Sequence, residues 1–199
     1  MKITEIKAQV KTAGRFSIFV DDKYAFSLSD TALLEQKLYI GQELDDKQLK
    51  DLKQASDDDK AFGLVLRYAS MRPHSEWEIR SYMQRKKVTP ALADKLLNKL
   101  TNLNLVDDIS FAKSWVESRR LLRPTSKRKL QQELRAKRVG DDAINQALAE
   151  DEADEQDVLR ALIAKKRARY PDDLKLMQYL ARQGFKYDDI KSALLEESD

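Results

Sequence analysis

The side chains of this sequence best suited to binding another molecule are positively charged and lie in the middle of the chain. Between residues 119 and 138 there are nine Lys and Arg side chains and only one acidic side chain, Glu133. One carboxylate cannot neutralise nine cations by i,i+4 pairing, whereas such a cluster suits contact with nucleic-acid phosphates. We predict a polyanion-binding site here, with an ordinary solvated face as the alternative. The nine are Arg119, Arg120, Arg123, Lys127, Arg128, Lys129, Arg135, Lys137 and Arg138.

Side chains for covalent or metal-dependent catalysis are nearly absent. The chain has no Cys and a single His, His74, which removes thiol nucleophiles, disulfides and most metal-ligand sets. The five glycines are too widely spaced to form a phosphate-binding loop. We therefore expect no enzyme activity, no cofactor and no metal. We expect His74, between Pro73 and Ser75, to be a surface residue in a turn.

Charge is unevenly distributed along the 199 residues, whose net charge is +3. Residues 1–60 have a net charge of −2, residues 61–108 of +3, residues 109–149 of +6 and residues 150–199 of −4. A basic segment between less basic neighbours is typical of a nucleic-acid-binding protein. The acidic stretch at 150–157 most simply begins a helix, where carboxylates favour the positive end of the dipole. It could instead compete with DNA for the basic face.

The N-terminal residues have the period-two pattern of strands. Phe16, Ile18 and Val20 alternate along one run and Tyr24, Phe26 and Leu28 along the next, which predicts a hairpin with its turn at residues 21–23. Residues 2–10 are expected to add a third strand. Ser29 or Asp30 can cap a short helix that covers the sheet, and Gly41 marks a turn. We expect a strand-rich module over residues 1–56, with residues 54–60 as a linker.

No apolar run approaches the roughly 18 residues that cross a bilayer, and the N-terminus lacks the apolar core of a signal peptide. We therefore expect a soluble protein of the cytoplasm that has no contact with a membrane.

From about residue 60 onward the apolar period becomes 3.6, and a helical unit of about 48 residues recurs three times. The marker pairs Arg72-Pro73, Arg123-Pro124 and Tyr170-Pro171 are 51 and 47 residues apart. Six apolar positions match in every copy. They are Ile79, Met83, Val88, Ala93, Leu96 and Leu97 in the first; Leu130, Leu134, Val139, Ile144, Ala147 and Leu148 in the second; and Leu176, Leu180, Phe185, Ile190, Ala193 and Leu194 in the third.

Each copy is expected to form three helices, which gives a mainly α fold of three tandem helix-turn-helix-like repeats after the N-terminal module. We expect the repeats at 57–106, 107–152 and 153–199. The second helix should begin at Ser75 with Glu78 as a capping box, and at Ser126 in the middle copy. It should end near Lys87, Arg138 and Gly184. The second helix of the first repeat also ends in basic residues, at the position that matches the basic end of the second helix in the middle repeat. We therefore add Arg85, Lys86 and Lys87 to the predicted site.

The first helix of the middle repeat should be capped by Asp107 or Asp108 and should bury Phe111, Ala112, Trp115 and Val116. Paired acids recur at expected helix starts, where capping explains them better than catalysis does. Trp77 and Tyr82 are expected to pack between repeats, with stacking on bases as the alternative.

The motifs of the middle repeat resemble those of the RecX family of bacterial recombination regulators. The residues that carry the resemblance are Leu105-Val-Asp-Asp, Phe111-Ala, Trp115-Val and Arg119, followed by Arg123-Pro, Ser126, Leu130, Glu133-Leu, Lys137 and Val139. The resemblance covers residues 61–197, and residues 1–55 look like the N-terminal extension of longer members. Members commonly carry Gly where this sequence has Thr125 and Lys137-Arg138.

The resemblance implies a non-enzymatic modulator of the RecA filament on single-stranded DNA, acting in DNA repair, recombination and the SOS response. It implies restraint of RecA ATPase, recombinase and coprotease activity, with stimulation left open. It also implies DNA binding without sequence specificity, with double-stranded DNA left open, by a protein that we expect to be a monomer. Two other hypotheses are a helix-turn-helix transcription regulator, which would discriminate among duplexes, and a scaffold that binds only proteins.

Overall fold

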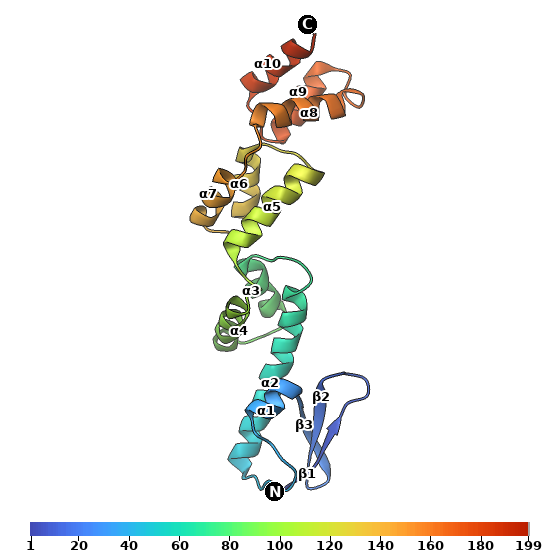
Figure 1. Cartoon of the computed structure of the whole chain (residues 1–199), viewed down its shortest axis with the longest axis vertical. Helices are drawn as coiled ribbons and strands as arrows, with labels where there is room; N and C mark the ends of the chain where they lie inside the picture. Colours follow the sequence, from blue (N-terminus) through green and yellow to red (C-terminus); the bar gives the residue numbers. More distant parts are fainter. Residues whose placement is uncertain (199) are drawn as a thin grey trace. The chain divides into compact units, whose positions relative to one another are not determined.

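The computed structural model has three strands and ten helices among residues 1–198, and side chains are described for residues 1–196 (Figure 1). The predicted mainly helical fold with a small N-terminal sheet is confirmed. The chain forms two compact units, one made of residues 1–68 and 83–96, the other of residues 69–82 and the chain from residue 97 onward.

The N-terminal sheet is antiparallel, with the order β1-β2-β3. Its strands are β1 (Ile3–Ala8), β2 (Arg15–Val20) and β3 (Lys23–Ser29). Asp21 and Asp22 form the turn between β2 and β3 with φ values of 48° and 61°, and such residues tolerate the left-handed conformation that a two-residue hairpin requires. The predicted hairpin and third strand are therefore confirmed.

Two helices cover this sheet. Helix α1 (Asp30–Glu35) begins at Ser29, whose side chain accepts a hydrogen bond from the Ala32 N–H. Helix α2 runs from Asp46 to Ala69. Apolar residues of the three strands, of α2 and of the segment before α2 form one buried cluster, which consists of Ile3, Ile18, Val20, Phe26, Leu28, Leu44 and Leu52. Ala32 and Leu33 of α1 are partly buried against it. Because a sheet of two or three strands is marginal alone, this burial is what stabilises the module.

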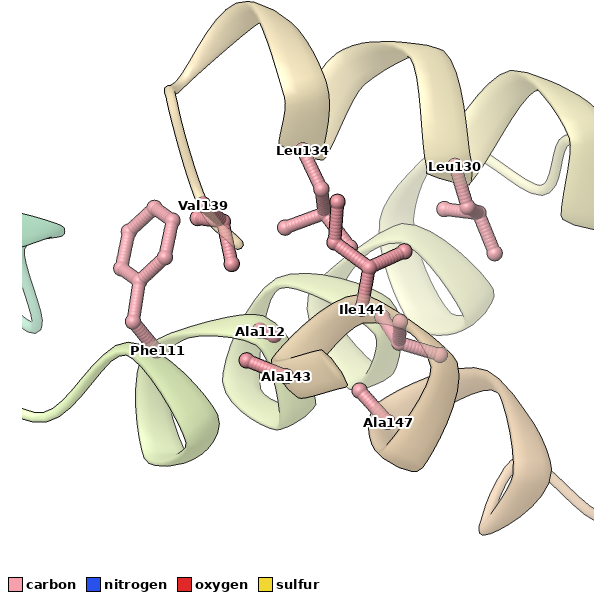
Figure 2. Packing of buried hydrophobic residues seen from close by; sticks show 9 residues of the cluster. Phe111, Ala112, Leu130, Leu134, Val139, Ala143, Ile144 and Ala147 are labelled. Atoms are coloured by element: carbon pink, nitrogen blue, oxygen red, sulfur yellow. The ribbon is translucent and has the colours of Figure 1, made fainter. Parts of the chain in front are cut away.

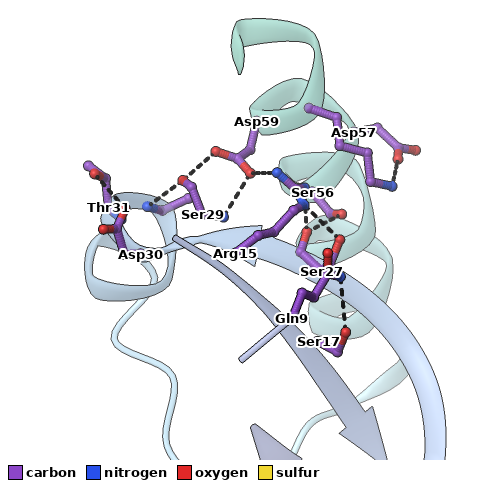
Figure 3. A network of polar contacts seen from close by, with 12 residues as sticks. Gln9, Arg15, Ser17, Ser27, Ser29, Asp30, Thr31, Ser56, Asp57 and Asp59 are labelled. Carbon is purple, nitrogen blue, oxygen red and sulfur yellow. Dashed lines mark hydrogen bonds and ion pairs between the residues drawn. The ribbon is translucent and has the colours of Figure 1, made fainter. Parts of the chain in front are cut away.

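The predicted linker at residues 54–60 is wrong, since α2 passes through it without a break. The segment contains no Gly or Pro that would end a helix, and its polar residues bind the sheet (Figure 3). Ser56 donates to the Ser27 carbonyl at 2.7 Å, while Asp59 pairs with Arg15 at 2.9 Å and accepts from the Ser29 hydroxyl at 2.6 Å. These contacts also occupy part of the open edge of β3, which would otherwise be exposed to strand pairing.

Helices α2 to α10 form three successive groups of three, which we call repeats 1, 2 and 3. The remaining helices are α3 (Glu76–Arg85), α4 (Pro90–Asn102), α5 (Asp108–Leu122), α6 (Lys127–Ala136), α7 (Asp141–Ala149), α8 (Glu155–Arg167), α9 (Asp173–Arg182) and α10 (Tyr187–Ser198). The predicted repeat and its three-helix unit are confirmed. The boundaries at residues 57, 107 and 153 stay a prediction, and the first of them lies inside α2.

Repeats 2 and 3 have cores that match position by position. In repeat 2, Leu130 and Leu134 of α6 pack against Ile144 and Ala147 of α7, and residues of the first helix, α5, complete the same cluster (Figure 2). In repeat 3 the same positions hold Leu176, Leu180, Ile190 and Ala193. The apolar positions matched in the sequence are thus the ones that are buried, as expected when each repeat must build its own small core.

The second helix of each repeat is followed by a residue with left-handed backbone. The φ values are 59° at Lys87, 58° at Arg138 and 94° at Gly184. A left-handed residue after the last turn lets the chain bond back to that turn, and Val139 N–H does so with the Leu134 carbonyl. Arg138 therefore adopts the left-handed conformation although it is not a glycine.

The second helices of neighbouring repeats also meet end to end. The Ser75 hydroxyl, before α3, donates to the Lys137 carbonyl at the end of α6 at 3.0 Å. The Thr125 hydroxyl and Ser126 N–H, before α6, donate to the Gln183 carbonyl at the end of α9 at 2.6 and 3.1 Å. We call these contacts junction 1 and junction 2. Both place donors that lie just before one second helix on the carbonyl of the residue just after another, which is favourable for both dipoles.

Junction 2 leaves no room for a side chain at Gly184, because an added Cβ would lie 2.8 Å from the Lys129 Cβ. We predict that Gly184→Ala lowers the free energy of unfolding by at least about 1 kcal/mol, since it adds left-handed strain to this clash. Urea denaturation followed by circular dichroism measures the change. Gly63→Ala is the matched control, because nothing lies within 4 Å of its Cβ inside α2, and it should stabilise by about 0.5–1 kcal/mol. A Gly184→Ala protein as stable as the wild type would contradict the close approach at junction 2.

Candidate nucleic-acid interface

The nine basic residues between positions 119 and 138 fall into two groups, those whose side chains bind acidic or carbonyl oxygens of the chain itself and those that have no such partner among the described residues. Arg119, Arg120, Lys127, Arg135 and Lys137 belong to the first group. Arg123, Arg128, Lys129 and Arg138 belong to the second. The distinction decides which cations can contact an external polyanion without first breaking a contact inside the protein.

Arg119 and Lys137 flank the ring of Trp115, with the Arg119 Cζ 4.7 Å and the Lys137 Nζ 5.2 Å from the ring centre. Glu133 accepts hydrogen bonds from Arg119 Nε at 2.7 Å and from Trp115 Nε1 at 2.9 Å. A cation over an aromatic face, paired with a carboxylate, is held in one orientation. Both cations therefore have a structural role beside junction 1.

Lys137 also reaches Glu78 on α3, with Nζ 2.5 Å from Oε1. Glu78 is buried and accepts a second bond, at 2.9 Å, from Arg72 Nη1. Burial alone would raise the pKa of Glu78, but the hydrogen bonds and charges of Arg72 and Lys137 outweigh it and hold that pKa below its usual value. Glu78 therefore pairs across junction 1 and does not complete the predicted capping box, although its N–H does donate to the Ser75 hydroxyl.

Arg120 is bound at junction 2. Its guanidinium meets Asp151 at 2.6 Å with only 14% and 6% of the two side chains exposed, and it also donates to the Thr125 carbonyl at 2.6 Å. The hydrogen bonds and charge of Arg120 outweigh the burial of Asp151 and lower the pKa of that carboxyl group. Removing one partner of a buried pair of this kind costs about 3–5 kcal/mol, so Arg120 has a structural role first.

Lys127 and Arg135 have weaker attachments. The Lys127 ammonium donates to the Asp151 carbonyl at 3.0 Å. Arg135 pairs with Asp141 at 2.9 Å, with more than half of each side chain exposed. An exposed ion pair contributes at most about 1 kcal/mol and is screened by salt, so a phosphate could replace Asp141 at little cost.

Most acidic side chains of the stretch at 150–157 form ion pairs, hydrogen bonds or a helix cap inside the protein. Helix α8 begins at Glu155, inside this stretch, as predicted, and Asp154 caps it. Glu150 pairs with Lys113 at 2.8 Å, and Glu155 accepts from the Lys127 N–H at 3.1 Å. The bond of Glu155, and those of Asp151 with Arg120 and Lys127, tie repeat 2 to the segment that begins repeat 3.

Arg123, Arg128 and Arg138 are exposed. Within the part of the chain whose side chains are described, none of the three has a carboxylate in ion-pair range. Arg123 lies just after α5, Arg128 in the first turn of α6 and Arg138 just beyond its end. These three guanidinium groups are the cations of repeat 2 most available to phosphates.

Arg85, Lys86 and Lys87 lie at the end of α3 and are exposed. They belong to the compact unit that contains the N-terminal sheet, whereas the cations of repeat 2 belong to the other. Their role in binding stays a prediction that rests on the matching position in the repeat.

The prediction that His74 is a surface residue is wrong. Its side chain is 3% exposed, and it stands directly before Ser75, which is fully buried at junction 1. Thr125, at the same place in repeat 2, is likewise buried next to Ser126. The turn that carries the marker proline is therefore the surface on which the next repeat packs. Trp77 is 44% exposed, so only part of its ring can pack inside the protein.

Among the described residues there is no group of three His, Asp and Glu side chains able to hold a metal ion. Of the helices found there, none is long and apolar enough to cross a bilayer. What the geometry supports is electrostatic contact by exposed guanidinium groups on a helical scaffold.

Comparison with known families gives four matches along the chain. A model described as the regulatory protein RecX N-terminal domain matches residues 1–45. Models described as the first, second and third three-helix domains of RecX match residues 61–100, 107–148 and 153–194.

Similar proteins are named regulatory protein RecX. The one from Bacillus pumilus is 31% identical over 99% of this chain and 78% of its own length, and the one from Bacillus subtilis is 30% identical over 96% and 75%. A crystal structure of regulatory protein RecX matches with a TM-score of 0.77 and 28% identity over 96% of this chain and 97% of its own. RecX from Lactobacillus salivarius, at a TM-score of 0.61 and 24% identity over 71% and 97%, shares the fold.

The burial of His74 predicts a pH dependence of stability. Burial, assisted by the charge of Arg72, lowers the pKa of His74 from 6.5, so the unfolded chain takes up this proton at a higher pH than the folded chain. The contribution of neutral His74 to the free energy of unfolding is therefore complete above about pH 6.5. It falls, by up to about 1.4 kcal/mol per pH unit, as the pH drops toward the lowered pKa of the folded state. Melting temperatures at pH 7 and pH 5.5 should differ more for the wild type than for His74→Gln. An equal fall in both proteins would show that His74 does not titrate in this way.

Proposed function

The chain belongs to the RecX family, and on that basis we propose that it binds the RecA filament on single-stranded DNA and restrains it. The restrained activities are the RecA ATPase, recombinase and coprotease functions in DNA repair. The chain acts without chemistry of its own, as a monomer in the cytoplasm. The exposed guanidinium groups of Arg123, Arg128 and Arg138 support the DNA-binding part of this proposal, since no carboxylate among the described side chains lies in ion-pair range of them.

An array of repeats suits work on a polymer. Each repeat can contact one region of a helical filament, and linked contacts reinforce one another because the second binds at a high effective concentration. Junction 1 and junction 2 hold successive second helices end to end, which limits how far neighbouring repeats can separate. Contacts made through phosphates carry no sequence information, so binding tolerates any sequence and weakens steeply with salt.

The helix-turn-helix transcription regulator is disfavoured by the third helix of repeat 2. In that mode the helix after the turn enters the major groove with its N-terminal residues against the bases. Helix α7 begins instead with Asp141 and Asp142 and has no Lys or Arg between Asp141 and Ala149. Two carboxylates at the leading end would be repelled by phosphates. The basic residues of repeat 2 lie on α5, on α6 and just beyond their ends.

We predict that the wild-type protein, added at a stoichiometric ratio, lowers ATP hydrolysis by RecA on single-stranded DNA. The Arg128→Glu, Arg138→Glu double variant should restrain RecA less and should bind single-stranded DNA at least about tenfold more weakly, because two phosphate contacts become repulsive. A coupled ATPase assay and fluorescence anisotropy measure the two effects.

The matched control is the Lys186→Glu, Lys191→Glu double variant, which makes the same change of charge at two exposed positions of repeat 3. It should behave like the wild type. RecA ATP hydrolysis that is unchanged by the wild-type protein would refute the proposed function. An equal loss in both double variants would mean that net charge, and not the surface of repeat 2, governs binding.

A further inference from the structure

A pocket of about 310 Å³ lies beside junction 2. Its lining is cationic, whereas the equivalent positions at junction 1 include acidic residues. Residues from the end of α5, from α8 and from α9 line it, and all belong to one compact unit. The lining residues that matter here are Arg123, Leu162, Lys165, Lys166, Tyr179 and Gln183. Three of these six side chains are cationic and one is aromatic.

The repeats allow each of these positions to be compared with its equivalent at junction 1. The first helices correspond with an offset of 47 residues, because buried Ala112 and Val116 match buried Leu159 and Ile163. This places Lys166 at the position of Arg119 and Leu162 at that of Trp115. The second helices correspond through their buried leucines, an offset of 46, which places Tyr179 at the position of Glu133.

At junction 1 these positions form a network in which the cations are balanced by acids. Glu78 is bonded to Arg72 and Lys137, and Glu133 is bonded to Arg119. Charge-assisted bonds of this kind fill the space and satisfy the guanidinium groups locally. An external anion would have to displace a carboxylate from each.

At junction 2 both carboxylates are replaced. Lys129 stands where repeat 1 has Glu78, and Tyr179 stands where repeat 2 has Glu133. The cations remain: Arg123 corresponds to Arg72, and Lys166 corresponds to Arg119. One cation is added, because Lys165 corresponds to the uncharged Ser118. In the described part of the chain no carboxylate lies in ion-pair range of Arg123, Lys165 or Lys166. The same framework that is neutralised at junction 1 is therefore left as a cationic pocket at junction 2.

The aromatic side of the pocket is firmly supported. Tyr179 is half-buried and stacks on Tyr170 with ring centres 5.2 Å apart. The Lys166 Nζ lies 5.7 Å from the Tyr179 ring centre, at the end of a flexible stem that can turn toward an entering anion. A supported aromatic ring beside cations is the arrangement on which proteins stack the bases of single strands.

We propose that the pocket at junction 2 binds one nucleotide of single-stranded DNA. Arg123, Lys165 and Lys166 contact its phosphodiester, and its base stacks against Tyr179. The inference rests on the proposed function, to which it adds the position and the chemistry of a single-strand contact. A base paired inside a duplex has no free face for the tyrosine, so the pocket favours single strands over duplexes.

The test measures the affinity of the full-length variants for a labelled oligothymidylate over a range of salt concentrations. Arg123→Gln and Lys166→Gln should each reduce the salt slope by about 0.7, the value for one lost phosphate contact on a single strand, whereas Lys191→Gln should not. Tyr179→Ala should weaken binding about 5- to 100-fold without changing the slope, and Tyr179→Phe should bind like the wild type.

An oligonucleotide of the same length with abasic sites distinguishes loss of base stacking on Tyr179 from loss of protein structure in Tyr179→Ala. The wild type should bind it more weakly than the intact strand, whereas Tyr179→Ala should bind both alike. If every pocket variant binds DNA normally while the wild type binds DNA and restrains RecA, the pocket proposal alone is wrong. If the Gln variants lose only RecA restraint and keep DNA binding, the pocket takes an acidic protein segment instead. A wild type that neither binds DNA nor restrains RecA refutes the proposed function itself.

Discussion

The end-to-end contact between second helices is the constraint on which the arrangement of the helical repeats depends. Ser75 at one junction, and Thr125 with Ser126 at the other, bring hydrogen-bond donors to a carbonyl at the end of the next second helix. These carbonyls and N–H groups have no partner inside their own helix, and leaving them buried without one would cost free energy. The contact therefore requires polar residues at buried positions, and a residue without a side chain at Gly184.

The same constraint determines which cations of repeat 2 remain available. Bringing the repeats together places Lys137 beside Glu78 and Arg120 beside Asp151, so these two cations stabilise the junctions. Arg123, Arg128 and Arg138 lie outside those contacts. A count of basic residues in the sequence thus overstates the surface open to a polyanion, since it includes cations that are neutralised by acids far away along the chain.

Much of the fold could be predicted from the sequence because its signals are local. Apolar spacing locates the helices, and Ser29, Asp107 and Ser126 cap them as their side chains predict. The failures occurred where the deciding partner is distant. Helix α2 continues through residues 54–60, where Asp59 binds Arg15 and Ser29 of the sheet, and His74 is buried at the repeat junction. No local pattern in the sequence indicates either contact.

The most direct test of the central claim is co-sedimentation with RecA filaments on single-stranded DNA, compared with binding to bare DNA as salt is raised. We propose that the repeats contact the filament itself and use DNA phosphates only in part, so a fraction of the affinity does not depend on salt. The protein should then sediment with filaments at a salt concentration that abolishes its binding to bare DNA. Release from both at the same salt concentration would show that it recognises only the polyanion, and would contradict a role as a filament regulator.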